Sequence, residues 1–366
     1  MNKDTLRAIL NILGILACLY LFLVGINGMS AAIKGMGSEF AEKILSTTSN
    51  PFVALFIGLL ATVLFQSSST TTSMIVSMVS GGVLSLGGAI PMIMGANIGT
   101  TVTNALVSLG HINRGNEFRR AFAASTIHDI FNVITTSILF PLEYYFHFLE
   151  KGATLMGTFL FGNITPENVF HSPVKDVVKW GTSQIKFFSF GNNIFFLVLS
   201  VGITLFMLFL IVKLLRNMVL AKVEVFFDKY IFKTALRAMI FGGFLTVMVQ
   251  SSSITTSLVV PLAGAGVLSL RQIFPYTLGA NVGTTATAII AALTLNVTAL
   301  VAAFAHLLFN ICGILIVYPI PFIRNIPIFL AEKLAIFSIK NKSIPILFIL
   351  IVYVLIPLTV ILIGEL

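Results

Sequence analysis

Charged residues are scarce in this sequence. Of its 366 residues, only 10% are Asp, Glu, Lys or Arg and 57% are hydrophobic, for a mean hydropathy of +1.02. Soluble domains carry about 25% charged residues, so these few could not cover a water-exposed surface. The composition therefore excludes a soluble enzyme and, despite the net charge of +9, a nucleic-acid-binding protein. It predicts an all-α integral membrane protein surrounded by the lipid bilayer.

The absence of charge is greatest in three stretches. Residues 44–110, 238–270 and 272–323 contain no charged side chain, yet they are rich in Ser, Thr, Asn and Gln. This pattern predicts a neutral, oxygen-rich interior at membrane depth. Cysteine is also rare, and the spacing of Cys18 and Cys312 predicts neither a disulfide nor a metal site.

The sequence contains two copies of one unit. At an offset of 184 residues, Gly58–Thr103 aligns without a gap on Gly242–Thr287. A Gln-Ser-Ser-Ser run begins at Gln66 and recurs at Gln250, and the run Gly-Ala-Asn-x-Gly-Thr-Thr begins at Gly95 and recurs at Gly279. Farther on, at an offset of 178, His128 and Asn132 recur as His306 and Asn310.

Each basic connector has a neutral counterpart in the other copy. Lys213–Arg237 holds six Lys and Arg residues against two in Lys34–Asn50, and the Arg114–Arg120 connector corresponds to the uncharged Leu295–Leu300. Since basic loops remain in the cytoplasm, the two copies are predicted to have opposite orientations, as in secondary transporters built from inverted-topology repeats. The N-terminus, both basic connectors and Arg324–Lys342 are then cytoplasmic.

This reading divides the chain into four parts. We expect repeat unit one at 1–150, an extracytoplasmic linker at 151–190, the inverted repeat unit two at 191–322, and an interfacial segment with a final span at 323–366. The long apolar run within 8–33 is the expected first span, without a cleavable signal, and Lys34–Asn50 is expected at the membrane interface.

The repeated motifs predict interrupted helices. Residues 51–80 predict a helical hairpin with the Gln-Ser-Ser-Ser run at its tip, and copy two predicts the same at Gln250. Glycines predict discontinuous helices broken at Gly95–Gly99 and Gly279–Gly283. Such breaks free backbone groups that only protein or a water-filled cavity can satisfy at membrane depth.

The polar groups at these positions suit ions. Amide and hydroxyl oxygens are ligands for hard cations, and helix N-termini favour anions. A bare anion in an uncharged pocket would be costly, so a cation companion is expected. Close helix packing also uses small polar residues; it is an alternative for any one of them but does not explain the doubled motifs.

Asp129 is the only carboxylate well inside a predicted span, which makes it a functional candidate. Its counterpart is Leu307, so we favour a hydrogen bond that joins helices over a coupling role. For the recurring histidines we favour packing over ligation. The candidates for coupling are His128, Asp129, Asn132, His306 and Asn310.

The doubled motifs, with Glu117–Phe122 running into His128–Asn132, resemble those of type II sodium/phosphate cotransporters. The resemblance implies sodium-driven symport of inorganic phosphate into the cell, across the bacterial inner (plasma) membrane, by alternating access. Sodium would be the only metal, with no other cofactor, and a homodimer is also considered.

The resemblance also suggests one midplane site formed by both repeats. For phosphate binding it suggests Gln66, Ser67, Ser68, Ser69, Thr100, Thr101, Gln250, Ser251, Ser252, Ser253, Thr284 and Thr285. For sodium binding it suggests Gln66, Thr71, Asn97, Gln250, Thr255 and Asn281.

Three other functions compete with this interpretation. A sodium-coupled symporter of another small anion, such as a dicarboxylate, would use similar polar hairpins. A channel would not need two occluding tips. An intramembrane enzyme would need a nucleophile–base pair or a metal cluster, and no buried Lys or second Asp accompanies either Gln-Ser-Ser-Ser run.

Overall fold

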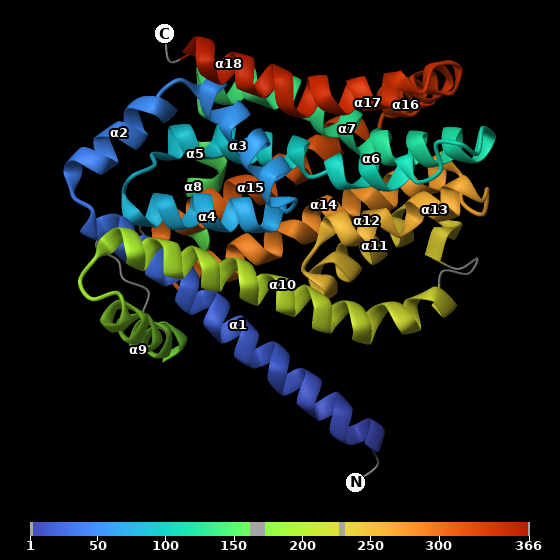
Figure 1. Ribbon diagram of the computed structural model, residues 1–366. Coiled ribbons are helices and arrows are strands. Elements are labelled where there is room, and N and C mark those ends of the chain that lie inside the picture. The colour runs from blue at the N-terminus through green and yellow to red at the C-terminus, as the bar shows by residue number, and fades with distance from the viewer. Residues whose placement is uncertain (1–2, 162–172, 227–230, 365–366) are drawn as a thin grey trace.

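The structure is a computed structural model that describes residues 3–161, 173–226 and 231–364, and every regular element in these ranges is helical. Figure 1 shows the helices gathered around a central group that contains α4, α5, α14 and α15, with α1 and α10 side by side along one flank. The helices before the chain midpoint are α1 (Lys3–Gly35), α2 (Ser38–Thr48), α3 (Pro51–Phe65), α4 (Ser68–Gly81), α5 (Leu86–Gly99), α6 (Val102–Leu109), α7 (Asn116–Phe146), α8 (Phe148–Phe161) and α9 (Pro173–Phe188). The later ones are α10 (Asn193–Phe226), η1 (Ile231–Lys233), α11 (Ala235–Val249), α12 (Ser252–Ser257), α13 (Val259–Gly264), α14 (Leu270–Ala292), α15 (Val297–Val317), α16 (Pro321–Lys340), α17 (Ser343–Leu350), η2 (Ile351–Leu355) and α18 (Ile356–Gly364).

Five of the helical segments are long and apolar enough to cross a membrane. They are Leu10–Gly35, Leu86–Leu109, Asn193–Leu214, Val297–Val317 and Ser343–Gly364. A sixth candidate consists of α2 and α3, which meet at an angle of 99°. The all-helical prediction is confirmed, and the first and last candidate spans lie at the two apolar runs in which the sequence predicts them.

The bend between α2 and α3 has a local cause. Asn50 lies in an extended conformation, and its side chain accepts a hydrogen bond from the Phe52 amide, while Pro51 occupies the first helical position. These are helix-start signals, so α3 begins anew instead of continuing α2. The segment expected at the interface thus forms a separate helix, with exposed Glu39 and Lys43.

Two helical hairpins form where they were expected. In the first, α3 ends at Gln66 and α4 begins at Ser68; in the second, α11 ends at Gln250 and α12 begins at Ser252. The return arm of the second hairpin is interrupted between α12 and α13. Pro261 lies just beyond this interruption and has no N–H to donate to the preceding turn.

The prediction of discontinuous helices at the glycines is wrong. Helix α14 runs without a break through Gly279–Gly283, and α5 ends only at Gly99. The glycines instead allow helices to touch. A Cβ atom on Gly95 would lie 1.8 Å from the Leu55 carbonyl oxygen, and one on Gly279 would lie 1.8 Å from the Met239 carbonyl oxygen.

In copy one there is a small irregularity, one step later than predicted. Thr100 and Thr101 separate α5 from α6, yet both keep right-handed helical dihedrals. The two helices together still count as one span.

The segment expected to be a linker is largely helical. It contains most of α8, which packs against α15, and the whole of α9, which contacts α1; residues 162–172 lie outside the described ranges. On α9, Trp180, Phe187 and Phe188 are exposed, as expected for side chains that meet lipid at an interface. Downstream, the segment expected at the interface forms α16, which packs along α7.

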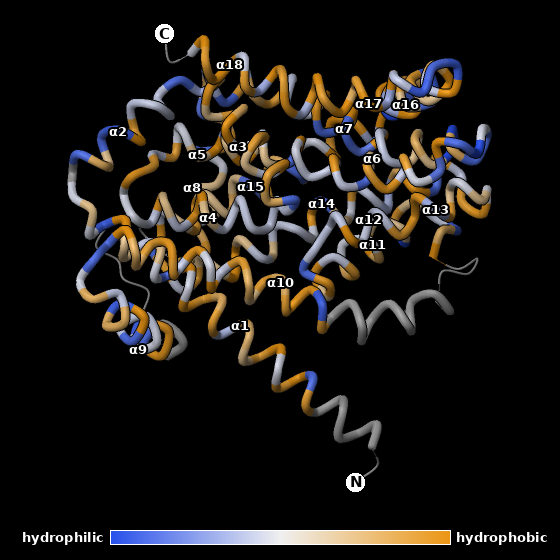
Figure 2. The backbone as a smooth tube through the Cα atoms, in the orientation of Figure 1, coloured by the Kyte–Doolittle hydropathy of each residue, from blue (hydrophilic) through white to orange (hydrophobic). Residues whose placement is uncertain are grey.

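Hydrophilic residues gather toward opposite ends of the molecule in Figure 2. One end contains α2 and α9, and the end of α18 lies toward it; the other contains the turn between α6 and α7. Helix α1 starts, and α10 finishes, toward the α6–α7 end (Figure 1). Part of the basic segment Lys213–Arg237 falls outside the described residues.

Candidate functional site

The two predicted hairpin tips have the same local geometry. Gln66 and Gln250 both adopt a left-handed backbone conformation, with φ of 53° and 57°. In the first tip, Gln66 Nε2 donates to the Val63 carbonyl (2.7 Å) and Oε1 accepts from Thr103 Oγ1 (3.0 Å). A non-glycine residue in this conformation is strained. The two side-chain hydrogen bonds therefore stabilise a backbone conformation that glycine would adopt more readily.

The second tip repeats each of these bonds. Gln250 Nε2 donates to the Val247 carbonyl (2.6 Å), and Oε1 accepts from Thr287 Oγ1 (2.8 Å). Sequence reasoning missed Thr103 and Thr287. They are identical residues at the repeat offset, and that signal was available to find them.

The serines after each glutamine begin the second arm of the hairpin. Ser67 Oγ accepts from the Thr70 amide (3.2 Å), and Ser251 Oγ accepts from the Ile254 amide (3.3 Å), so both serines are N-caps. The next two serines of each run are buried: Ser68, Ser69, Ser252 and Ser253. Of these, Ser253 Oγ donates to the Thr100 carbonyl (3.3 Å), which ties the second hairpin to copy one.

The threonines predicted to bind ions donate to carbonyls of their own helices. The bonds run from Thr71 to Ser67, from Thr255 to Ser251, from Thr100 to Ala96, from Thr284 to Ala280, from Thr101 to Ile98 and from Thr285 to Val282. A hydroxyl that donates in this way keeps its oxygen lone pairs. In the geometry seen here, these groups can coordinate a cation, whereas donating to an anion would require the hydroxyl hydrogens to rotate.

A buried network crosses between the repeats. His128 Nε2 lies 2.6 Å from Asn281 Oδ1, and in the mirrored pair His306 Nε2 lies 3.4 Å from Asn97 Oδ1. Asn281 Nδ2 donates to Asn132 Oδ1 at 2.7 Å. With an amide oxygen facing each ring, Nε2 carries the proton in both histidines.

The asparagines that follow each histidine by four residues complete the network. Asn132 Nδ2 donates to the Asn97 carbonyl (2.8 Å), and Asn310 Nδ2 contacts the Asn281 carbonyl (3.5 Å). All the side chains of this crossed network are buried. The structure therefore brings together residues that the sequence placed in separate candidate groups for sodium binding and for coupling.

Asp129 joins two helices, the role favoured from the sequence. The Tyr353 hydroxyl donates to Asp129 Oδ1, and Thr101 Oγ1 lies 3.0 Å from the same hydroxyl. Asp129 is buried, and its Oδ2 has no partner among the described residues. Tyr353 was missed; it lies on η2, a π-helical turn of a kind often found at functional sites.

Asn104 is a second polar contact that sequence reasoning missed. Its Nδ2 donates to Thr256 Oγ1 (2.7 Å), and its Oδ1 accepts from Ser257 Oγ (2.8 Å), which links α6 to α12. Its counterpart at the repeat offset is Ala288. This contact therefore exists on one side only.

The second arm of each hairpin ends at a backbone carbonyl that accepts a hydrogen bond from a side chain of the other copy. Arg120 Nε and Nη2 donate to the Gly264 carbonyl at 2.8 and 2.6 Å, and Asn296 Nδ2 donates to the Ser80 carbonyl at 3.2 Å. Ser80 and Gly264 are equivalent at the repeat offset. The hydrogen bonds from the charged Arg120 side chain thus correspond to a hydrogen bond from the neutral Asn296 side chain at the equivalent position.

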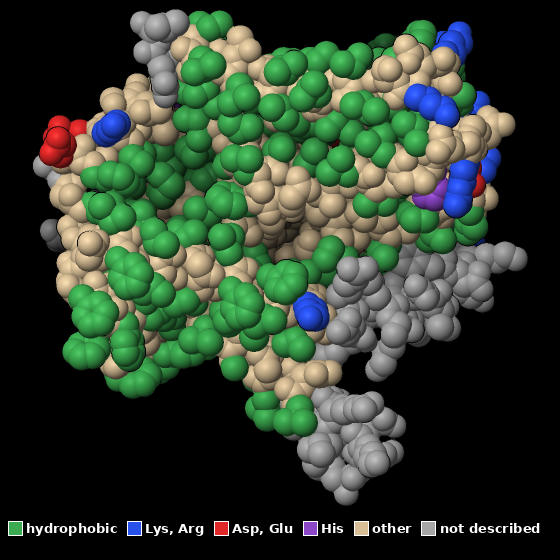
Figure 3. Space-filling model, in the orientation of Figure 1, with side chains coloured by type: hydrophobic (Ala, Val, Ile, Leu, Met, Phe, Trp, Pro, Cys, Tyr) green, Lys and Arg blue, Asp and Glu red, His purple; other side chains and the backbone are tan. Residues whose placement is uncertain are grey.

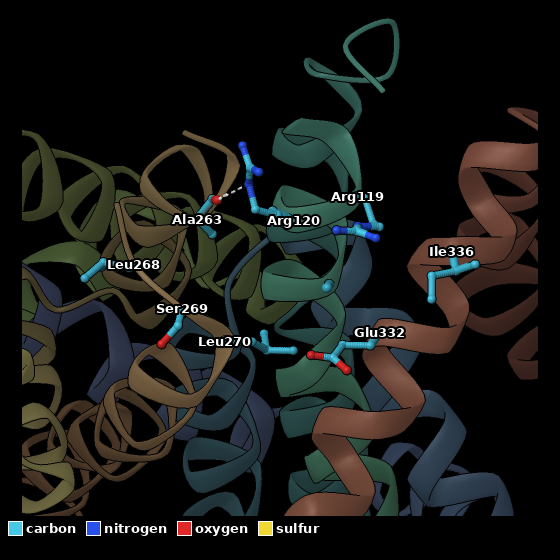
Figure 4. A pocket seen from close by; sticks show the side chains of 9 residues that line it. Arg119, Arg120, Ala263, Leu268, Ser269, Leu270, Glu332 and Ile336 are labelled. Carbon is cyan, nitrogen blue, oxygen red and sulfur yellow. Dashed lines mark hydrogen bonds between the residues drawn. The ribbon is translucent and has the colours of Figure 1, made fainter. Parts of the chain in front are cut away.

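Apart from the buried Asp129, the charged side chains described around this arrangement lie toward its edge. A pocket of about 350 Å³ is lined by Arg119, Arg120, Ser269 and Glu332, among others, and Figure 4 shows Arg119 on α7 and Glu332 on α16 projecting between their two helices. By contrast, Figure 3 shows a hollow near the centre of the visible face, bordered by tan atoms, which are backbone and side chains of the remaining types, and by some hydrophobic side chains. The predicted ion-binding residues themselves are all uncharged.

Comparison with known proteins decides the family. The family model described as Na+/Pi-cotransporter matches residues 21–162 and 194–316, which include both hairpins and the crossed network. The chain belongs to the Na+/Pi-cotransporter family. This family consists of transporters, so the intramembrane enzyme considered from the sequence is excluded.

Curated family members agree along almost the whole chain. Sodium-dependent phosphate transport protein 2B of Homo sapiens is 33% identical over 442 residues, covering 94% of this chain and 64% of its own length. Sodium-dependent phosphate transport protein 2A of Ovis aries is 34% identical over 421 residues, covering 93% and 66%. The chain therefore spans slightly under two thirds of the length of these relatives, and no solved structure matches it.

Proposed function

We propose that this protein is a symporter that uses the sodium gradient to bring inorganic phosphate into the cell. The observation that carries the proposal is the matched pair of glutamine turns, at Gln66 and Gln250, with the same backbone conformation and the same threonine partners. Packing alone does not require two strained turns with identical polar contacts. Membership of the family and the names of the relatives supply the substrate.

Hydroxyls and backbone amides at the hairpin tips bind the phosphate in this proposal. The ligands are the Gln-Ser-Ser-Ser runs with Thr100, Thr101, Thr284 and Thr285. The N-terminus of α4 points its first amides away from the helix and carries partial positive charge, which favours an anion. Because these groups are neutral, they bind phosphate only if its charge is offset nearby.

Sodium supplies that offset. Its proposed ligands are oxygens of Gln66, Thr71, Asn97, Gln250, Thr255 and Asn281, in keeping with the preference of hard cations for oxygen. Four of these side chains are buried in addition to being uncharged: Thr71, Asn97, Thr255 and Asn281. Each ion lowers the desolvation cost of the other, and this mutual dependence is the coupling.

Transport follows by alternating access between two inverted repeats. The two hairpins approach the centre from opposite halves of the molecule in Figure 1, an arrangement that supports this topology. We place the start of α1 and the Arg114–Arg120 connector in the cytoplasm of a cell whose plasma membrane holds the protein. His128, Asn132, His306 and Asn310 couple the hairpins through the crossed network, and Asp129 through Tyr353.

Radiolabelled phosphate uptake into proteoliposomes tests the proposal. Uptake is expected with sodium outside and is expected to fall to the background with potassium. Equal uptake in both salts would overturn sodium coupling, and unsaturable flux would favour a channel. Competition by arsenate is expected; competition by succinate without arsenate competition would instead support a dicarboxylate carrier.

A further inference from the structure

The joint between α7 and α8 carries three metal-ligating side chains remote from the hairpin tips. Helix α7 ends where His147 turns into a left-handed conformation, with φ of 51°, and α8 starts at the next residue. Since α7 has 31 residues, it spans about 46 Å. Its C-terminal joint therefore lies far from the Arg114–Arg120 connector, at the end that we assign to the extracytoplasmic side.

Glu143, His147 and Glu150 each offer one ligand atom, and these three atoms lie within 4.8 Å of one another. His147 Nδ1 is 3.2 Å from Glu150 Oε2. His147 caps the end of α7, where its amide donates to the Glu143 carbonyl (2.9 Å) and keeps the two residues close together. Helix α8 starts directly after this turn, which brings Glu150 beside His147.

Glu143 has a structural role that accounts for one of its two oxygens. Its Oε2 accepts from the amides of Leu149 (2.6 Å) and Glu150 (3.3 Å), and so caps the start of α8. Its Oε1 is buried and has no partner among the described residues. The side chain is 96% buried, from a relative exposure of 4%, so leaving a carboxylate oxygen unpartnered there is costly.

We propose that Glu143, His147 and Glu150 bind a divalent transition-metal cation of the zinc class. An imidazole nitrogen with two carboxylate oxygens is a ligand set found in zinc sites, where water completes a fourfold arrangement. Tetrahedral ligands about 2.1 Å from a metal lie roughly 3.4 Å apart. The half-exposed His147 and Glu150 side chains, 57% and 31% exposed, can rotate to reach that spacing.

The electrostatics of the site favour a divalent ion. Two carboxylates balance the charge of a divalent cation, which offsets the repulsion from the positive N-terminal end of α8. Lys151 lies beside the site and adds a competing positive charge. A monovalent ion would leave one carboxylate charge unbalanced, and sodium prefers oxygen to an imidazole nitrogen, so sodium is not the expected occupant.

Cobalt titration of tag-free, detergent-purified protein tests the site. We expect one saturable Co²⁺ site with visible d–d absorption that Zn²⁺ displaces. His147→Asn keeps a residue suited to the left-handed turn, and Glu150→Gln keeps the shape of the side chain. Each is expected to weaken Co²⁺ binding by at least tenfold.

Two matched variants serve as controls. Glu39→Gln removes an exposed carboxylate on α2, and His111→Asn removes a histidine that contacts Glu117 at the opposite end. Both are expected to bind Co²⁺ as the wild type does. Unchanged binding in His147→Asn and Glu150→Gln, or absence of a saturable site in the wild type, would overturn the proposal. Neither test depends on transport activity.

Discussion

The two hairpin tips resemble each other far more than their surroundings do. Gln66 and Gln250 share a backbone conformation, a carbonyl acceptor three residues back and a threonine donor 37 residues ahead. Around them the symmetry is incomplete, since the crossed network is mirrored but its distances are unequal. Tyr353 joins only copy one through Thr101 and Asp129, and Asn104 has no polar counterpart in copy two.

This difference separates two kinds of requirement. In the proposed site both turns present the same polar groups to one centre, which accounts for the contacts that the two copies share. The surroundings of the two turns differ because they contact different elements. In copy one, for example, Tyr353 on η2 bonds Thr101 and Asp129. Symmetric residues are thus the better candidates for ligand binding, and asymmetric residues the better candidates for assembly.

The largest effect is expected from the glycines at the helix contacts. Gly95→Ala and Gly279→Ala would each place a Cβ atom 1.8 Å from a backbone carbonyl oxygen. Overpacking against side chains costs about 1–3 kcal/mol, and a carbonyl within a helix yields less. We expect both variants to fail to accumulate as folded protein, measured by membrane expression and size-exclusion profile.

Gly202→Ala is the matched control, because a Cβ atom there has no neighbour within 4 Å. It should fold normally. If Gly95→Ala folded and Gly279→Ala did not, the two copies would differ in packing as well as in surroundings.

Loss of uptake without loss of folding is expected at the turns. Gln66→Gly and Gln250→Gly suit the left-handed backbone but remove the amide and free a threonine donor. Each should reduce sodium-dependent phosphate uptake at least a hundredfold while leaving the thermal unfolding midpoint within a few degrees. Near-normal uptake by one variant alone would show that a single turn carries the site.

A graded difference is expected between the two buried asparagines on α5 and α14. Asn281 bonds His128 at 2.6 Å and Asn132 at 2.7 Å, whereas Asn97 lies 3.4 Å from His306 and otherwise donates to the Ile93 carbonyl of its own helix (3.0 Å). Each buried group left unsatisfied costs about 1–3 kcal/mol. Asn281→Ala should therefore lower the unfolding midpoint more than Asn97→Ala, and equal shifts would contradict the unequal network.

The smallest net effect is expected for a double change where symmetry is already broken. Tyr353→Phe removes the hydroxyl between Asp129 and Thr101 and should destabilise the protein by about 1–3 kcal/mol. Adding Asp129→Leu, the residue at the equivalent position of copy two, removes the stranded carboxylate and should recover part of that loss. If the double variant folds but does not transport, Asp129 takes part in coupling and its role is not only to join helices.

Much of this architecture could be predicted from the sequence because the repeat makes it visible twice. The hairpins and the first and final apolar runs follow from local signals. The breaks at Gly95 and Gly279 were wrong because a glycine can interrupt a helix or admit a neighbouring backbone. The neighbours that decide between the two, Leu55 and Met239, lie 40 residues away in each case.

The candidate site was predicted to a lesser extent. Residue types identified the polar centre, but the pairing of His128 with Asn281 spans 153 residues and has no periodic signature. Tyr353 is 224 residues from Asp129, and no pattern in the final apolar run indicates that the two side chains form a hydrogen bond. Thr103 and Thr287 are different, since the repeat offset alone was sufficient to find them.

The glycine contacts also restrict how the protein can move. Where a backbone carbonyl lies against a glycine Cα, no flexible side chain lies between the two helices to accommodate sliding. We therefore expect α3 and α5 to move as one rigid pair, and α11 and α14 as another. In the alternating-access cycle proposed above, the change of shape is therefore expected at the contacts around these two rigid pairs. At one such contact, between α1 and α4, the Ile33 side chain lies against Gly81. Residues at these contacts, more than those within the two rigid pairs, should set the speed of the proposed transport cycle.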